Sequence, residues 1–381
     1  MAATVPHKRV EFTELFYDLV FVYAISKMTG LIHHLENGIL PAFNFATFIT
    51  CLLLLVNTWM IQTMFTNRFG KNSLFNMSIM FVDMGLLMLF SNDFNSNWES
   101  TFYLFNLCFA LLSGTLLLQY AVQFWQSKDE RERSVILAFL KILSVRTFGV
   151  LLALLFPFQY GVWIALTAVI ISFLMPIAYQ KQMDLVPINF PHLIERISLL
   201  VIISFGEMIV GVASFFQPDN FGIQSIFFLL IVIALYLIYF LEFDHILDTG
   251  LQTLGFRLIY SHYLVFAGIL MTTVSMTFLS EHEVNHFFVV SFLYAGLCAF
   301  LLAVVLNGSY NKAAYKWTRT FLAMYWLIFA VGFLLSLVFA TTPLIVTIIT
   351  TGTLFLIWIQ FIQFYLKNHK KTKDPHKIYW I

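Results

Sequence analysis

The chain has 381 residues, of which 60% are apolar, 18% are aromatic and 11% are charged, and its formal net charge is +1. Soluble domains carry about 25% charged residues, so a soluble fold of this composition would expose apolar patches large enough to cause aggregation. The composition therefore excludes an ordinary soluble domain. It predicts a membrane protein whose solvent and first partner is the lipid bilayer.

Twelve apolar runs are long enough to cross a bilayer as helices, which takes about 20 residues each. Strands of a membrane barrel would instead show short segments of alternating polarity, and the sequence has none. We therefore predict an all-α bundle of about twelve transmembrane spans. In chain order the runs fall near residues 12–34, 41–65, 74–92, 101–126, 134–156, 158–179, 192–216, 223–244, 258–280, 285–307, 318–340 and 344–366.

The connections between these runs alternate in charge. The odd ones (32–41, 92–101, 156–158, 216–223, 280–285 and 340–344) contain no Lys or Arg. Cytoplasmic loops are enriched in these residues, so the pattern predicts an even number of spans with both termini in the cytoplasm. The basic residues of the other connections and the ends are Lys8, Arg9, Arg68, Lys71, Lys128, Arg131, Arg133, Lys181, Arg257, Lys312, Lys316, Arg319, Lys367, Lys370, Lys371, Lys373 and Lys377.

The first and seventh runs share acidic residues near their starts. One reads ELFYDLVFVYAIS from Glu14 and the other ERISLLVIISFGE from Glu195, and each opens a group of six spans. We predict two parallel six-helix repeats, residues 1–183 and 184–381, related by an axis along the membrane normal. The basic tail belongs to the second repeat.

These two segments resemble the bacterial low temperature requirement A (LtrA) membrane proteins, and the resemblance covers nearly the whole chain. It implies a multi-pass protein of the bacterial plasma membrane, connected with growth in the cold. It implies no particular biochemical activity.

Ionisable residues inside the runs are the candidate functional side chains. A charge at the bilayer centre costs about 2.5–3.5 kcal/mol on insertion scales, so each should face the protein interior and have a partner. The set is read either as a polar pathway for protons, ions or a solute, or as an ion-pair network that fixes packing. Its members are Glu14, Asp18, Asp83, Arg146, Glu195, Arg196 and Glu207.

Helical spacing groups some members of this set. Glu14 and Asp18 are four residues apart and share a face, so they repel unless a cation lies between them. Arg196 and Glu207 share a face but lie about 16 Å apart along the axis, so each needs a partner on another helix. Beside Glu207, Gly206 and Gly211 are expected to allow close approach of another helix.

Weaker signals lie at the ends of the runs. His282 and His286 have the i, i+4 spacing of a metal pair, but polar surface residues are the expectation for so short a loop. Glu242, Asp244 and His245 end the eighth run, where we expect them at the membrane interface. The three cysteines, Cys51, Cys108 and Cys298, lie inside apolar runs, which argues against a disulfide framework and a CxxC metal site.

The sequence contains no Walker A, GxSxG or HExxH motif and no basic aromatic patch of the kind that binds nucleic acid. We therefore expect no cofactor, no metal and no nucleic-acid partner. The first hypothesis is a secondary transporter or ion-coupled permease for a small polar solute or proton, with Glu207 or Asp83 protonated during coupling and Arg146 as the counter-charge.

Two further hypotheses stay open. One is a membrane-embedded sensor or scaffold in cold adaptation, whose buried charges only hold the bundle together. The other, ranked last, is an intramembrane enzyme acting on a lipid, with Glu14 and Asp18, or Glu242 and Asp244, holding Mg²⁺. Nothing in the sequence predicts the substrate or the oligomeric state.

Overall fold

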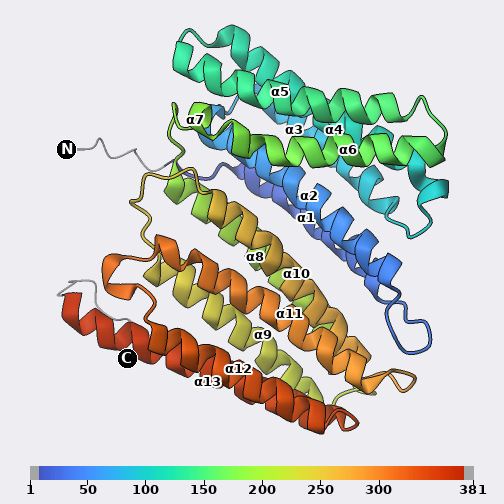
Figure 1. Cartoon of the computed structure of the whole chain (residues 1–381), viewed down its shortest axis with the longest axis vertical. Coiled ribbons are helices and arrows are strands. Elements are labelled where there is room, and N and C mark those ends of the chain that lie inside the picture. The colour runs from blue at the N-terminus through green and yellow to red at the C-terminus, as the bar shows by residue number, and fades with distance from the viewer. Residues whose placement is uncertain (1–7, 373–381) are drawn as a thin grey trace. The chain divides into compact units, whose positions relative to one another are not determined.

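The computed structural model describes residues 8–372, and the side chains as far as His369 (Figure 1). Within these residues twelve helices are long and apolar enough to cross a membrane, which confirms the all-α class and the number of spans. They are α1 (Phe12–Thr29), α2 (Ala42–Phe69), α3 (Leu74–Asn92), α4 (Trp98–Gln126), α5 (Glu130–Ala153), α6 (Phe158–Ala178), α8 (Phe190–Ala213), α9 (Ile223–Phe240), α10 (Phe256–Phe278), α11 (His286–Asn307), α12 (Arg319–Val338) and α13 (Pro343–Thr372).

Short elements join or extend these helices. Helix α7 (Gln180–Met183) precedes α8, and a π-helical turn, η3 (Leu241–Ile246), continues α9. The side chains of the tail cations Lys370, Lys371, Lys373 and Lys377 lie outside the described part. The predicted position of this tail at the inner leaflet therefore stays a prediction.

Polar residues in the loops fix where several helices begin. The side chains of Ser73 and Asn97 accept hydrogen bonds from backbone N–H groups at the starts of α3 and α4. Asn285 and Thr318 cap α11 and α12 in the same way. Such caps satisfy N–H groups that have no partner within the helix, so the loop sequence sets the boundaries that hydropathy alone leaves uncertain.

The chain folds into two compact units. The first contains the chain up to His34, Leu40–Leu200 and Gln252–Phe256, and the second contains Leu35–Ile39, Val201–Leu251 and the chain from Arg257 onward. The boundary thus lies within α8, after Leu200. The division at residue 183 and the relation of the halves as repeats stay predictions.

Small residues allow close helix contacts inside each unit. In the first, a Cβ atom added to Gly149 of α5 would lie 2.4 Å from the Cβ of Ala168 on α6. In the second, a Cβ on Gly268 of α10 would lie 2.7 Å from the carbonyl oxygen of Gly296 on α11. The expectation for Gly206 is wrong, because no atom lies within 4 Å of the position of its added Cβ, whereas Gly211 does meet Thr273.

Candidate functional site

The first turns of α1 place two carboxylates on the inner face of the first unit. Glu14 and Asp18, one helical turn apart, are 4% and 0% exposed. Glu14 Oε2 also accepts a hydrogen bond of 3.1 Å from the backbone N–H of Glu11, which satisfies one of the free N–H groups at the start of the helix. Two buried acids this close require a compensating charge.

Arg196 of α8 supplies that charge. Its Nη1 lies 3.2 Å from Glu14 Oε1 and its Nη2 lies 2.8 Å from Asp18 Oδ1. The arginine side chain is itself fully buried. The structure therefore brings together three of the predicted site residues, from two helices that lie 178 positions apart in the chain.

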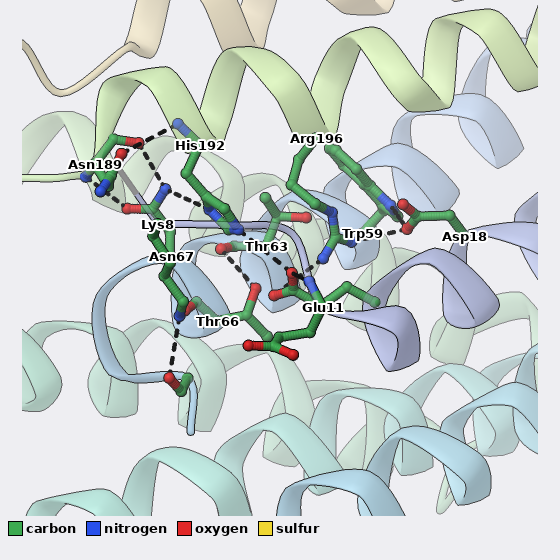
Figure 2. A network of polar contacts seen from close by, with 12 residues as sticks. Lys8, Glu11, Asp18, Trp59, Thr63, Thr66, Asn67, Asn189, His192 and Arg196 are labelled. Atoms are coloured by element: carbon green, nitrogen blue, oxygen red, sulfur yellow. Dashed lines mark hydrogen bonds and ion pairs between the residues drawn. The ribbon is translucent and has the colours of Figure 1, made fainter. Parts of the chain in front are cut away.

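Trp59 of α2 contacts both members of this ion pair (Figure 2). Its indole Nε1–H donates a hydrogen bond of 2.7 Å to Asp18 Oδ1, and the Arg196 guanidinium carbon lies 5.3 Å from the centre of its ring. The ring face attracts the cation and the ring edge satisfies the anion. Sequence reasoning missed Trp59, because it lies in a continuous apolar run.

His192 extends the cluster one turn toward the start of α8. Its Nε2 lies 3.3 Å from Glu14 Oε2, and the ring is fully buried. His192 and Arg196 are four residues apart, like the two acids that they contact. This spacing was visible in the sequence, although it was not used, and it places two matching pairs on facing helices.

A clamp between Asn67 of α2 and the backbone of Asn189 defines the hydrogen-bonding role of His192. Asn67 Oδ1 accepts from the Asn189 N–H and Asn67 Nδ2 donates to the Asn189 carbonyl, both at 2.9 Å. Nδ2 also lies 3.1 Å from His192 Nδ1. Because the clamp makes Nδ2 a donor, His192 Nδ1 accepts, and Nε2 carries the proton that points at Glu14.

Asn189 has a second role at the same place. Its side-chain Oδ1 accepts a hydrogen bond of 3.2 Å from the backbone N–H of His192, so it caps the start of α8. The residue thereby fixes both the start of the helix that carries His192 and the amide that contacts it. The backbone and the side chain of one residue together position the cluster.

Lys8 closes the end of the cluster nearest the start of the chain. Its ammonium donates to the carbonyl oxygens of Thr66 and, at 3.0 Å, of Gly70 at the end of α2, and the Thr66 oxygen also accepts the backbone N–H of Gly70. Burial lowers the pKa of Lys8 below its ordinary value, although the carboxylates of Glu14 and Glu11 act in the opposite direction.

Several buried polar atoms near the cluster have no hydrogen-bond partner within residues 8–372. They include Asp18 Oδ2, Tyr17 Oη and, one turn along α2 from Trp59, Thr63 Oγ1 and both amide atoms of Gln62. Buried polar groups in native proteins are almost always satisfied. This side of the cluster therefore suits water or another small polar guest.

Asp83 lies at the middle of α3 and is 1% exposed. The hydroxyl of Thr115 on α4 donates a hydrogen bond of 2.5 Å to its Oδ1. No Lys, Arg or His of the described chain forms an ion pair with this carboxyl group. Asp83 is thus a buried acid held by a neutral donor.

Arg146 of α5 is also 1% exposed, and its Nη1 donates a hydrogen bond of 2.6 Å to Asn57 Oδ1. Its guanidinium lies 5.3 Å from the ring centre of Phe109. Phe109 in turn lines a mostly apolar pocket between α2, α4 and α6, whose walls also include the side chains of Thr47, Thr50, Asn95, Thr101 and Asn106. Phe109 therefore connects Arg146 with the pocket, because its ring contacts the guanidinium and also lines the pocket wall.

The other predicted residues lie outside the cluster. Glu195, next to Arg196, is only partly buried, and Glu207 is partly buried in the second unit. Glu242 is fully buried, whereas the side chain of Asp244 is 58% exposed, so the two do not form a shared carboxylate site. Their expected position at the membrane interface stays a prediction.

The proposed metal pairs also find no support. Glu14 and Asp18 bind Arg196, and His282 lies in the loop before α11, so His282 and His286 do not share a helix. Within the described residues, no group of three or more His, Cys, Asp or Glu side chains is close enough to hold a metal ion.

Twelve apolar helices with a buried charge cluster define a multi-pass membrane protein. Comparison with protein families matches residues 9–358 to the family described as bacterial low temperature requirement A protein (LtrA). The chain belongs to this family, as its two acidic segments predicted. No curated protein and no solved structure matches the chain significantly.

Proposed function

We propose that this protein is a secondary transporter or ion-coupled permease that moves a small polar solute with protons. The observation that carries the proposal is Asp83, a carboxyl group that is buried at the centre of a transmembrane helix and that, among the residues the structure describes, is bound to the hydroxyl of Thr115 and to no cation. An unpaired carboxylate is expensive at that depth, so the acid is neutral when buried and ionises when water reaches it. Proton coupling needs such a group.

The pocket beside Phe109 supports a role for Arg146 in the same pathway. The mostly apolar pocket between α2, α4 and α6 has Phe109 in its wall, and the ring of Phe109 contacts the guanidinium of Arg146. A fixed guanidinium attracts anionic groups and offers them a planar pair of donors. We therefore expect the solute to carry a carboxylate or another anionic group.

A scaffold or sensor is the second candidate, and the Arg196 cluster favours it. Arg196 contacts both acids and an aromatic ring, which is also how a purely structural clamp is built. If the protein were a scaffold, it would carry no solute flux, and neutral substitutions at Asp83 and Arg146 would change only its stability.

The test uses purified protein in liposomes loaded with a fluorescent pH indicator, with the membrane potential clamped by potassium and valinomycin. Small carboxylates, phosphate and amino acids are added outside, one at a time, and internal acidification is recorded. We expect at least one solute to drive proton entry. Asp83→Asn should abolish this coupled flux, and Arg146→Gln should raise the solute concentration that it requires.

Asp219→Asn, in an exposed loop, and Arg131→Gln, on an exposed face of α5, are the matched controls and should transport normally. Proton entry that is equal in Asp83→Asn and the unmodified protein would contradict the proposal. So would the absence of solute-driven proton entry across the whole set of solutes.

We further propose that the protein lies in the bacterial plasma membrane with both chain ends in the cytoplasm. The support is the distribution of Lys and Arg, which are present in every second connection and absent from the others. An even number of helices places the two ends on one side.

A further inference from the structure

The second unit contains a buried acid in an unusual backbone setting. After α9 the chain continues as the π-helical turn η3 (Leu241–Ile246), in which the N–H of Leu247 bonds to the carbonyl oxygen of Glu242 at 3.0 Å, five residues back. Turns of this kind occur at the C-terminal ends of helices. The turn leaves Glu242 with no exposed surface, while Asp244 points outward.

No cation compensates Glu242 among the residues that the structure describes. The nearby basic side chains bind elsewhere: Lys312 Nζ donates to the carbonyl oxygen of His245 at 3.0 Å, and His245 Nδ1 lies 3.5 Å from Asp244. His262 of α10 is bonded to Tyr239 and to the Leu258 carbonyl. Burying a carboxylate without a cation is one of the most costly arrangements in a protein.

The groups that do face Glu242 are neutral. They are the side-chain amide of Asn311 and, from α12, the titratable Tyr325, whose hydroxyl donates to the Leu301 carbonyl at 3.3 Å. Both oxygens of Glu242 and Oδ1 of Asn311 are buried without a hydrogen-bond partner. All three atoms accept hydrogen bonds, so what the cluster lacks is a hydrogen-bond donor.

We propose that Glu242 is a proton-binding site of the second unit, and that its carboxylic acid O–H donates to Oδ1 of Asn311. One proton neutralises the buried acid and gives Asn311 Oδ1 a donor. A metal cation fits less well, because Na⁺-like and Ca²⁺-like ions take about six or more oxygen ligands, and this cluster offers three free acceptors.

This inference does not depend on the transport function, because it concerns the resting protein. The first test is infrared spectroscopy of the purified protein in lipid nanodiscs, with ¹³C-labelled glutamate to separate glutamic from aspartic acid bands. At neutral pH we expect a carboxylic acid carbonyl band that is lost in Glu242→Gln and kept in Glu99→Gln, which changes an exposed acid. Sodium or calcium chloride should not reduce the band.

The second test compares thermal unfolding as the pH is raised. The glutamine variant imitates the protonated acid, so its melting temperature should agree with that of the unmodified protein to within about 2 °C near pH 4, where the unfolded chain also keeps the proton. From about pH 5 upward the unmodified protein should melt earlier than Glu242→Gln, and increasingly so as the pH rises, because the unfolded chain releases a proton that the folded protein holds. Glu242→Ala should melt earlier at every pH.

Two results would overturn the proposal. If the glutamic acid band is absent at neutral pH, Glu242 is ionised. If the band is present and sodium or calcium removes it while raising the melting temperature, the site binds a metal cation in place of a proton. Each result can be obtained whether or not any solute drives proton entry in liposomes.

Discussion

Arg196 of α8 and Asp18 of α1 form an ion pair of 2.8 Å in which neither side chain has any exposed surface. The same guanidinium binds Glu14 through its other terminal nitrogen. One arginine thus lies between two acids and weakens the repulsion that they would otherwise exert on each other in a site without bulk water. Removing Arg196 should therefore weaken the packing of α1 against α8.

We expect Arg196→Gln to lower the free energy of unfolding by about 3–5 kcal/mol, because two buried carboxylates lose their counter-charge. Thermal unfolding in detergent, followed by size-exclusion chromatography, measures the change. Neutralising all three residues in Glu14→Gln/Asp18→Asn/Arg196→Gln should recover much of the loss. Arg131→Gln is the exposed control, and a melting temperature for Arg196→Gln equal to that of the control would refute the electrostatic role.

The two contacts of Trp59 can be separated by substitution. Trp59→Phe keeps a ring beside Arg196 but removes the N–H that binds Asp18. A hydrogen bond to a charged group contributes about 1.5–3 kcal/mol, so we expect a loss of that size. Trp59→Leu removes the ring as well and should cost roughly 1 kcal/mol more. Trp125→Phe, at a largely exposed position, should have little effect.

We expect the two buried histidines to be neutral and to carry the proton on different ring nitrogens. His192 should carry its proton on Nε2, and His262 should carry it on Nδ1, which lies 2.6 Å from the Leu258 carbonyl oxygen. Solid-state ¹⁵N NMR of histidine-labelled protein distinguishes the two forms, with His192→Gln and His262→Gln giving the assignment.

The same spectra test whether Asn67 determines which ring nitrogen of His192 carries the proton. Asn67→Asp replaces a donor with an acceptor, so we expect His192 to become protonated on both ring nitrogens while His262 does not change. A His192 signal that is the same in Asn67→Asp would show that the clamp does not determine its form.

Two glycines in the second unit form a matched pair. Gly268→Ala would place a Cβ 2.7 Å from the Gly296 carbonyl oxygen, and we expect it to cost about 1–3 kcal/mol by overpacking. Gly206→Ala meets open space and should stabilise α8 by up to about 1 kcal/mol, because alanine favours the helix. Equal melting temperatures for the two variants would contradict the close contact of α10 with α11.

The proposed orientation predicts which loops reach the cell exterior. In a variant without native cysteines, single cysteines at Asn95 and Glu283 should react with a membrane-impermeant maleimide added to intact cells. Cysteines at Glu130 and Ala314 should react only after the membrane is broken. Labelling of either cytoplasmic position in intact cells would contradict the proposed topology.

Hydropathy predicted the twelve helices because every crossing of the hydrocarbon layer needs about 20 apolar residues, and this requirement is local in sequence. The need for a cation near Glu14 and Asp18 was also local, since residues four apart share a helix face. The identity of that cation was not, because Arg196 lies 178 residues away from Asp18. Only the tertiary structure selects it from the other basic residues.

Glu242 shows why the second unit was harder to read. Hydropathy ended the eighth span at residue 244 and did not indicate that the carboxyl group of Glu242 is buried in the protein. The structure continues the helix as a π turn to Ile246 and buries the carboxyl group. A π turn changes the angle between successive side chains, and no residue pattern in the sequence predicts it.

The clamp on Asn67 has an evolutionary consequence, because it joins a side chain to a backbone. Any residue except proline at position 189 offers the same N–H and carbonyl group, so drift there would alter only the cap of α8, which serine, threonine or aspartate can also provide. Position 67 has no such freedom, since a primary amide is needed to donate and accept together. Among relatives, we expect position 67 to vary much less than position 189.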